Sequence, residues 1–204
     1  MLSFDLALAL AATVLALALR PWRAVTDLPW PALALWAALP LLWSVDRLSA
    51  MPVMQPLAGS CLLLMMLGWP LAVLMLLPVA GLMAVMTDLG AVELLQRLVW
   101  LGLVPITLSM AIGAALRRWL PHHLFVYILG RGFFATGLAL GLAGALSVAL
   151  NGVPYGLNAD DVVLARVLAA SGDAFITGMF VAIFVAFRPQ WLATYADRIY
   201  LPPK

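Results

Sequence analysis

The residue of this sequence with the most obvious chemical role is Asp173, an acidic side chain inside the apolar stretch 162–187. It lies about 11 residues into that stretch, which at the helical rise is roughly 16 Å, near the centre of a bilayer. A carboxylate at that depth is costly and usually faces a cavity, an ion or a partner. Thr177 follows one turn later on the same face. We therefore predict Asp173 and Thr177 as substrate-binding residues; the alternative is a protonated Asp173 that hydrogen-bonds a neighbouring helix for packing alone.

Sulfur-containing side chains form a second candidate site. Met51 and Met54 lie three positions apart in a loop, and Cys61 follows at the start of the next apolar stretch. Thioether and thiol groups suit soft ions such as Cu(I), but methionine also fills apolar interiors without any ligand role. Met51, Met54 and Cys61 are therefore weak candidates for metal ligands.

The basic and imidazole side chains do not complete either site. Arg131 is the candidate counter-charge for Asp173, but counting back from the loop between their helices places the two residues roughly 12 Å apart along the helix axes. We expect Arg131 to extend to the inner membrane surface instead. His122 and His123 are adjacent, so on a helix they point about 100° apart and do not form an i,i+4 metal pair. An interfacial position near lipid or a partner is the simpler interpretation.

Several classes of function are excluded by what the sequence lacks. A single cysteine excludes an internal disulfide and every CxxC motif, and no apolar segment contains a histidine that could serve as a base or a haem ligand. Lys204 is the only lysine, so no Walker A phosphate loop can form. We predict that the chain is not an enzyme, requires no cofactor and relies on other subunits for ATP-driven work. The scattered basic residues also argue against nucleic acid as a partner.

The elements that position these residues must lie in a membrane. The chain has 204 residues, of which 66% are hydrophobic and 10% charged, whereas a soluble domain averages roughly half apolar residues. One span needs about 20 apolar residues. We predict a single integral membrane domain over residues 1–204, an all-α polytopic bundle in contact with lipid. The seven expected segments are 2–19, 29–45, 57–68, 70–87, 94–116, 124–150 and 162–187.

The third and fourth segments form one apolar stretch interrupted by Gly68-Trp69-Pro70. As a single kinked helix, 57–87 would be roughly 45 Å long, well beyond the hydrocarbon core. As a hairpin, it leaves most acidic loop residues on one side of the membrane. By the positive-inside rule, the hairpin predicts a bacterial inner-membrane protein with its N-terminus outside and its C-terminus in the cytoplasm. The basic residues that then share the cytoplasmic side are Arg20, Arg23, Arg117, Arg118, Arg188, Arg198 and Lys204.

Small residues recur at every fourth position of the last segment. This spacing forms one smooth stripe on a helix, along which another helix can approach closely. Most such stripes pack the bundle itself, and some dock a second protein. The candidate docking residues are Ala170, Ala174, Gly178, Ala182 and Ala186.

Most of the chain, from the second segment to Leu201, resembles a known family. The resemblance lies in PLAGSCLLLMMLGWPLA, LPHHLFVYILGRGFF and GDAFITGMFVAIFVAFRPQWLATYADRIYL, which are similar to proteobacterial members of the cobalt/nickel energy-coupling-factor (ECF) ABC transporter permease family. The last stretch is the most specific, because 173–178 matches an acidic-x-x-Ile-Thr pattern. The resemblance implies a seven-helix capture subunit that takes a divalent transition-metal ion, cobalt or nickel, from outside. It also implies a separate transmembrane coupling subunit and cytoplasmic ATPase subunits as partners.

The sequence departs from the metal-binding members of that family at two places. Those members begin Met-His, whereas this chain begins Met1-Leu2, and neither Gln55 nor Pro56 supplies their second histidine. The nitrogen-rich site that favours Ni(II) or Co(II) is therefore incomplete. Two hypotheses follow from the sequence. The chain is either an ECF-type permease component with Asp173 supporting its substrate site, or a membrane scaffold or assembly protein that keeps the fold without the metal site.

Overall fold

The computed structural model describes residues 2–23, 29–49, 55–153 and 158–200, and every regular element within them is a helix. The all-α prediction is therefore confirmed. Met51 and Met54 lie outside the described residues. The elements are α1 (Leu2–Ala18), η1 (Pro21–Arg23), α2 (Trp30–Trp43), α3 (Val45–Leu48), α4 (Ser60–Leu67), α5 (Trp69–Met86), α6 (Ala91–Arg97), η2 (Leu98–Leu103), α7 (Val104–Trp119), η3 (Val126–Phe134), α8 (Ala135–Asn151), α9 (Ala159–Phe187), η4 (Pro189–Trp191) and α10 (Asp197–Tyr200).

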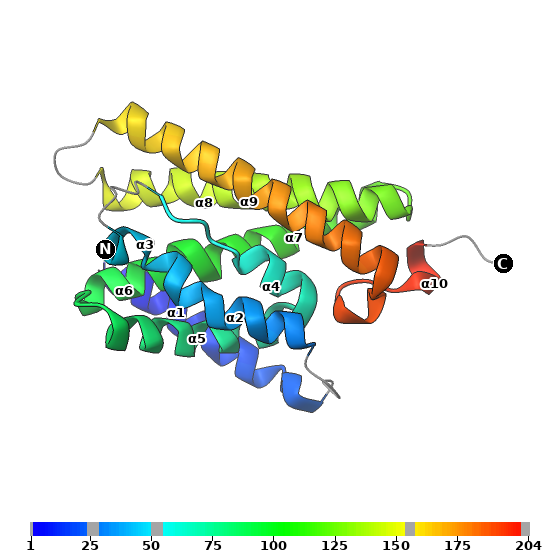
Figure 1. The fold of residues 1–204 in the computed structure, drawn as a ribbon, viewed down its shortest axis with the longest axis horizontal. Helices are drawn as coiled ribbons and strands as arrows, with labels where there is room; N and C mark the ends of the chain where they lie inside the picture. The colour runs from blue at the N-terminus through cyan, green and yellow to red at the C-terminus, as the bar shows by residue number, and fades with distance from the viewer. Residues whose placement is uncertain (1, 24–28, 50–54, 154–157, 201–204) are drawn as a thin grey trace.

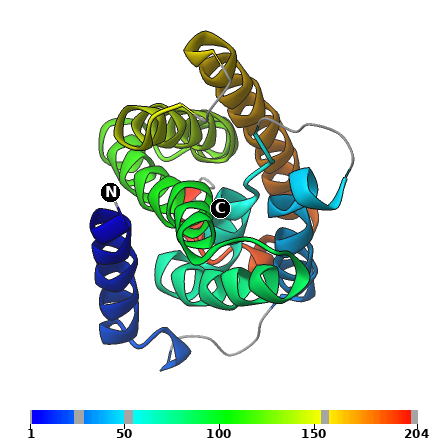
Figure 2. The same cartoon turned by 90° about the vertical axis from the view of Figure 1, so that its left-hand side faces the viewer.

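Within the described residues, five helical runs are long and apolar enough to cross a membrane, as expected for a multi-pass membrane protein. They include two continuous runs in which a π-helical stretch joins the flanking α-helix: η2 with α6 and α7, and η3 with α8. In Figure 1 the long helices run along the same axis, and Figure 2, which looks along the bundle, shows α1 at its edge. A shorter apolar helix, α2, has 14 residues. The five runs are Leu2–Arg23, Trp69–Met86, Ala91–Trp119, Val126–Asn151 and Ala159–Phe187.

The third expected segment is a half-length helix. α4 has eight residues, so at 1.5 Å per residue it is about 12 Å long, less than half of a hydrocarbon core of about 30 Å. Gly68, with a φ of 77°, separates it from α5, a backbone conformation that glycine adopts without strain. The break at Gly68-Trp69-Pro70 therefore divides 57–87 into two helices, whereas seven full crossings stay a prediction.

α4 lies at the centre of the bundle, in contact with α2, α5, α7 and α9 (Figure 1). All eight of its side chains are buried, as expected for a helix that is apolar on every face. Its C-terminal carbonyls are bonded to the segment after α9: Met66 O accepts from the Ala193 N–H at 3.2 Å, and Met65 O from the Thr194 N–H at 3.3 Å. Its N-terminus faces the middle of α9, as described below.

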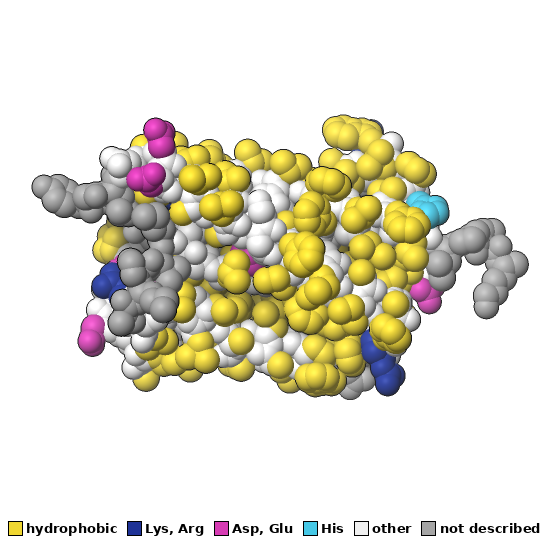
Figure 3. All heavy atoms as spheres, turned by 45° about the horizontal axis from the view of Figure 1, so that its top comes forward, with side chains coloured by type: hydrophobic (Ala, Val, Ile, Leu, Met, Phe, Trp, Pro, Cys, Tyr) yellow, Lys and Arg dark blue, Asp and Glu magenta, His cyan; other side chains and the backbone are white. Residues whose placement is uncertain are grey.

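Charged residues gather at the two ends of the bundle, and the face drawn in Figure 3 is mainly apolar between them. We call one end the arginine-rich end; it holds Arg20, Arg23, Arg117, Arg118 and Arg188, next to the ends of α1, α7 and α9. We call the other the carboxylate-rich end; it also contains Arg47 and Arg97. Its acidic residues are Asp46, Asp88, Glu93, Asp160 and Asp161.

Candidate functional site

A cavity of about 690 Å³ extends from the carboxylate-rich end into the bundle and reaches Asp173. Cavities of roughly 300–1,000 Å³ are typical of small-molecule sites. The lining comes from α3, α6, α8, α9, η2 and the non-helical segment 55–59. This segment leads from the carboxylate-rich end to the start of α4. The polar lining residues are Asp46, Gln55, Glu93, Gln96, Arg97, Ser147, Asn151, Arg166 and Asp173.

Asp173 lies at the inner end of the cavity and is hydrogen-bonded to segment 55–59. Its side chain lies at the middle of the 29-residue helix α9 and is 4% exposed. Oδ2 accepts a hydrogen bond from the Ala58 N–H at 2.7 Å, and Oδ1 accepts one from the Gly59 N–H at 2.9 Å. These donors lie at the N-terminus of α4, where an acceptor satisfies free N–H groups and a negative charge is favoured by the helix dipole. Asp173 therefore caps the start of a helix far away in the sequence from outside, by bonding the two residues that precede its first turn.

Two further bonds hold the same segment. The Trp43 Nε1–H donates to Ala58 O at 2.7 Å, and the Ser60 hydroxyl donates to Leu101 O at 2.7 Å. Gly59 has a φ of 62°, and a Cβ there would lie 3.0 Å from Leu39 Cδ2, so the position favours glycine. Non-helical backbone at membrane depth is tolerated only where protein buries it or where it lines a water-filled cavity. Segment 55–59 meets this requirement at Ala58 and Gly59, because Asp173 accepts from their N–H groups and Trp43 donates to the Ala58 carbonyl.

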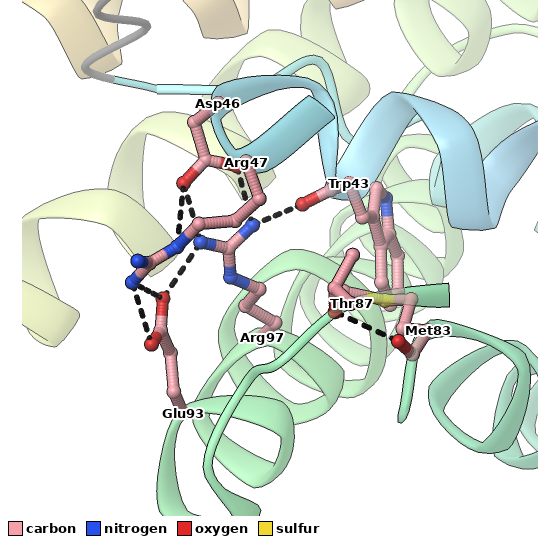
Figure 4. A network of polar contacts seen from close by, with 7 residues as sticks. All are labelled: Trp43, Asp46, Arg47, Met83, Thr87, Glu93 and Arg97. Atoms are coloured by element: carbon pink, nitrogen blue, oxygen red, sulfur yellow. Dashed lines mark hydrogen bonds and ion pairs between the residues drawn. The ribbon is translucent and has the colours of Figure 1, made fainter. Parts of the chain in front are cut away.

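An ion-pair cluster lies at the carboxylate-rich end of the cavity (Figure 4). The Arg97 guanidinium donates to both carboxylate oxygens of Asp46, at 2.7 and 2.6 Å, and to Glu93 Oε1 at 2.7 Å. It also donates to the Trp43 carbonyl. Arg47 donates to both oxygens of Glu93, at 2.9 and 3.0 Å. Two arginines thus neutralise two carboxylates and tie α3 to α6.

This cluster predicts a loss of stability in acid. Burial raises the pKa of Asp46, but hydrogen bonding and the charge of Arg97 outweigh burial and hold that pKa below its ordinary value. A lowered pKa contributes stability that is complete above the unfolded-state pKa of about 3.9 and is lost as the pH falls through the folded-state value. We expect Asp46→Asn to flatten the acid limb of the unfolding free energy measured in detergent micelles as the pH falls below about 5 toward about 2. Equal flattening by Asp160→Asn, an exposed control, would contradict this expectation.

Arg166 enters the same cavity without a carboxylate partner. Its Nη1 donates to Gly144 O at 2.6 Å, and no ion pair involves it among the described residues. Its Nε is buried and has no acceptor in the described part of the chain. Asn151 Nδ2 is also buried without an acceptor there, although Asn151 Oδ1 accepts from Gln96 Nε2 at 3.4 Å. Two residues that line the cavity therefore each carry a buried donor for which the described part of the chain offers no acceptor.

The other residues singled out from the sequence lie elsewhere. Thr177 is buried one turn beyond Asp173 but does not line the cavity. Cys61 is buried in α4, near the hydroxyls of Ser60, Ser109 and Thr136. In the described ranges, no group of three or more His, Cys, Asp or Glu side chains could hold a metal ion. Of the three sulfur candidates, the structure places only Cys61, because Met51 and Met54 fall outside those ranges.

The basic candidates lie at the arginine-rich end. Arg131 Nη1 donates to Thr194 O at 3.4 Å, and its guanidinium lies 5.6 Å from the centre of the Tyr127 ring. Arg131 is therefore oriented away from Asp173, as expected. His122 and His123 are exposed between α7 and η3, and His123 Nδ1 accepts from the Phe125 N–H. Both histidines thus lie at the protein surface, and their position at a membrane interface stays a prediction.

Part of the small-residue stripe packs inside the bundle. A Cβ at Gly178 would lie 3.2 Å from Phe133 Cβ, and a Cβ at Gly137 would lie 3.3 Å from Ala174 Cβ, so α9 approaches η3 and α8 closely there. Ala170 is buried and lines the cavity. The end of the stripe differs: Ala182 is half-buried and Ala186 is exposed. Docking of a second protein at these last two positions stays a prediction.

Sequence reasoning missed a second buried acid, Asp5. This side chain is 1% exposed, and its Oδ1 accepts from the Trp100 Nε1–H at 3.0 Å. Trp100 in turn lines the cavity. Asp5 is not among the candidate site residues predicted from the sequence. Its position inside an uninterrupted apolar stretch was the signal that it is buried.

Comparisons with known proteins add no functional residue to this site. No protein-family model, curated protein or solved structure matches the chain. The resemblance to ECF permeases therefore stays a prediction, and the function is inferred from the geometry of the cavity.

Proposed function

We propose that this chain is the membrane-embedded substrate-capture component of an ECF-type transporter in a bacterial inner membrane. The observation that carries the proposal is the cavity of about 690 Å³, which reaches from the carboxylate-rich end to Asp173. Asp173 supports the site indirectly, because it is hydrogen-bonded to segment 55–59, which forms the inner wall of the cavity. A solute that enters from one side would reach the middle of the bundle without crossing it.

Charge distribution supports an orientation with the cavity facing outward. Arginines mark the cytoplasmic face of membrane proteins, and the arginine-rich end lies opposite the mouth of the cavity. This orientation places the N-terminus outside and the C-terminus in the cytoplasm. The half-length helix α4 and its non-helical approach also resemble the discontinuous helices at which many transporters bind their substrates.

The cargo implied by the family resemblance, a cobalt or nickel ion, does not fit the donors present. The cavity carboxylates of Asp46 and Glu93 are bonded to Arg97, and Asp173 is bonded to two N–H groups. The cavity lining also includes no histidine or cysteine among the described residues. We therefore propose capture of a small solute, and the lack of a Walker A motif requires separate coupling and ATPase subunits.

Gentle purification from native membranes tests this proposal. We expect the full chain to co-purify with a transmembrane coupling protein and with ATPase subunits, identified by mass spectrometry. Co-purification with an unrelated complex, and no ATPase, would instead support the scaffold or assembly role. An Asp173→Asn chain that inserts normally but no longer supports uptake would link the cavity to transport.

A further inference from the structure

The unpaired guanidinium of Arg166 suggests which chemical class the cavity binds. The cavity lining includes two described arginines, Arg97 and Arg166. Arg97 is neutralised by Asp46 and Glu93, whereas the only hydrogen-bond acceptor for Arg166 among the described residues is the Gly144 carbonyl. A half-buried charge with a single neutral partner is costly unless another acceptor completes it.

Two donors point to the kind of acceptor that is missing. Arg166 Nε and Asn151 Nδ2 are both buried without an acceptor among the described residues, and both residues line the cavity. A guanidinium presents its N–H groups in a planar fork that matches the two oxygens of a carboxylate. The amide of Asn151 supplies a further donor of the kind that fixes the orientation of a ligand.

We propose that the cavity binds a small organic monocarboxylate, with its carboxylate on Arg166. One uncompensated positive charge matches one negative charge better than it matches a phosphate dianion, since Asp173 lies two helical turns further along α9. The body of such a ligand would contact the apolar part of the lining, which includes Trp100, Leu101 and Leu140. The claim that such an acid is transported rests on the proposed function. The claim that it binds in the cavity does not.

The volume of the cavity favours an organic acid over a bare ion. A single metal ion or halide needs only a few ligand atoms, whereas about 690 Å³ is the size of a small-molecule pocket. The lack of a side chain at Gly144 also makes space for Arg166, because a Cβ at Gly144 would lie 3.3 Å from Arg166 Cβ and Cδ. The close approach of α8 and α9 thus directs the guanidinium along the cavity wall.

Binding to the full chain in lipid nanodiscs, measured by titration calorimetry, tests the proposal. The probes are benzoate, phenylacetate and hexanoate, each compared with its own primary amide, and also inorganic phosphate, NiCl₂ and CoCl₂. We expect each acid to bind about tenfold or more tightly than its amide, because the amide cannot replace a charge-assisted hydrogen bond. Arg166→Gln should weaken acid binding about tenfold or more, and Arg166→Lys should retain part of it.

The matched control is Arg188→Gln, which removes an exposed arginine at the arginine-rich end, away from the cavity lining, and it should bind the acids as the wild type does. Equal affinity for acid and amide, no binding of any acid, or tighter binding of phosphate or metal ions would overturn the proposal. If Arg166→Gln fails to fold, the acid–amide comparison on the wild type and the Arg166→Lys variant decides. Acid binding without co-purified ATPase subunits would refute only the transport function. Co-purified ATPase subunits without acid binding would refute only the proposed ligand.

Discussion

Replacing Asp173 with alanine is expected to lower the free energy of unfolding by roughly 2–5 kcal/mol, because two buried N–H groups lose their acceptors at membrane depth. Those groups belong to Ala58 and Gly59, which the carboxylate bonds at 2.7 and 2.9 Å. Lipid cannot replace the lost bonds. The start of α4 would then have to rearrange or the cavity would have to hydrate it.

The size of this effect is measured by unfolding the protein in mixed detergent micelles. Asp173→Asn should cost less, since its amide oxygen can still accept one of the two N–H groups. The matched control is Ser171→Ala, on the same helix, whose exposed hydroxyl bonds only the Val167 carbonyl one turn back. Its cost should stay within about 0.5 kcal/mol. If Asp173→Ala were as stable as Ser171→Ala, the capping role of Asp173 would be wrong.

Replacing Trp43 with alanine is expected to cost about 3 kcal/mol, mainly from the cavity left by a large side chain. Trp43 is fully buried against Gly102, where a Cβ would lie only 2.9 Å from its ring. Lipid is as apolar as this interior, so the loss comes from contacts rather than from transfer to water. The variant also loses the hydrogen bond from Nε1 to Ala58 O.

A more conservative pair of variants separates the hydrogen bond from the packing. Trp43→Phe removes the bond to Ala58, and Trp36→Phe removes an equivalent bond of 2.7 Å, from Trp36 Nε1 to Met75 O. Trp43 and Asp173 hold the same peptide segment, so Trp43→Phe should be non-additive with Asp173→Asn by about 0.5–3 kcal/mol, whereas Trp36→Phe should add independently. Equal coupling energies in the two double-mutant cycles would show that Trp43 and Asp173 do not hold segment 55–59 together.

The sequence predicted the features that depend on local composition. Apolar length predicted the helices, and Gly68-Trp69-Pro70 predicted a break where the structure has one. Counting along the last apolar stretch also predicted Asp173 well inside a helix, and it lies at the middle of α9, whereas its depth in a bilayer stays a prediction. These predictions succeed because residues close in the sequence determine them.

The features that the sequence did not predict are contacts between distant segments. Asp173 meets a backbone 115 residues earlier, and Arg97 joins an acid 51 residues earlier. A backbone N–H carries no residue identity, so no spacing in the sequence could mark Ala58 and Gly59 as the partners of Asp173. The unpaired state of Arg166 likewise follows only from seeing which carboxylates Arg97 already occupies.

α4 connects the cavity to the opposite face of the protein. The two residues before its first turn are bonded to α9 through Asp173, and its last turn is bonded to Ala193 and Thr194 through the carbonyls of Met66 and Met65. A helix of two turns is stiff along its axis, so these attachments move as one strut. A ligand that shifts the inner wall of the cavity would therefore displace the C-terminal segment as well, and the occupied state would be readable at the other side of the membrane.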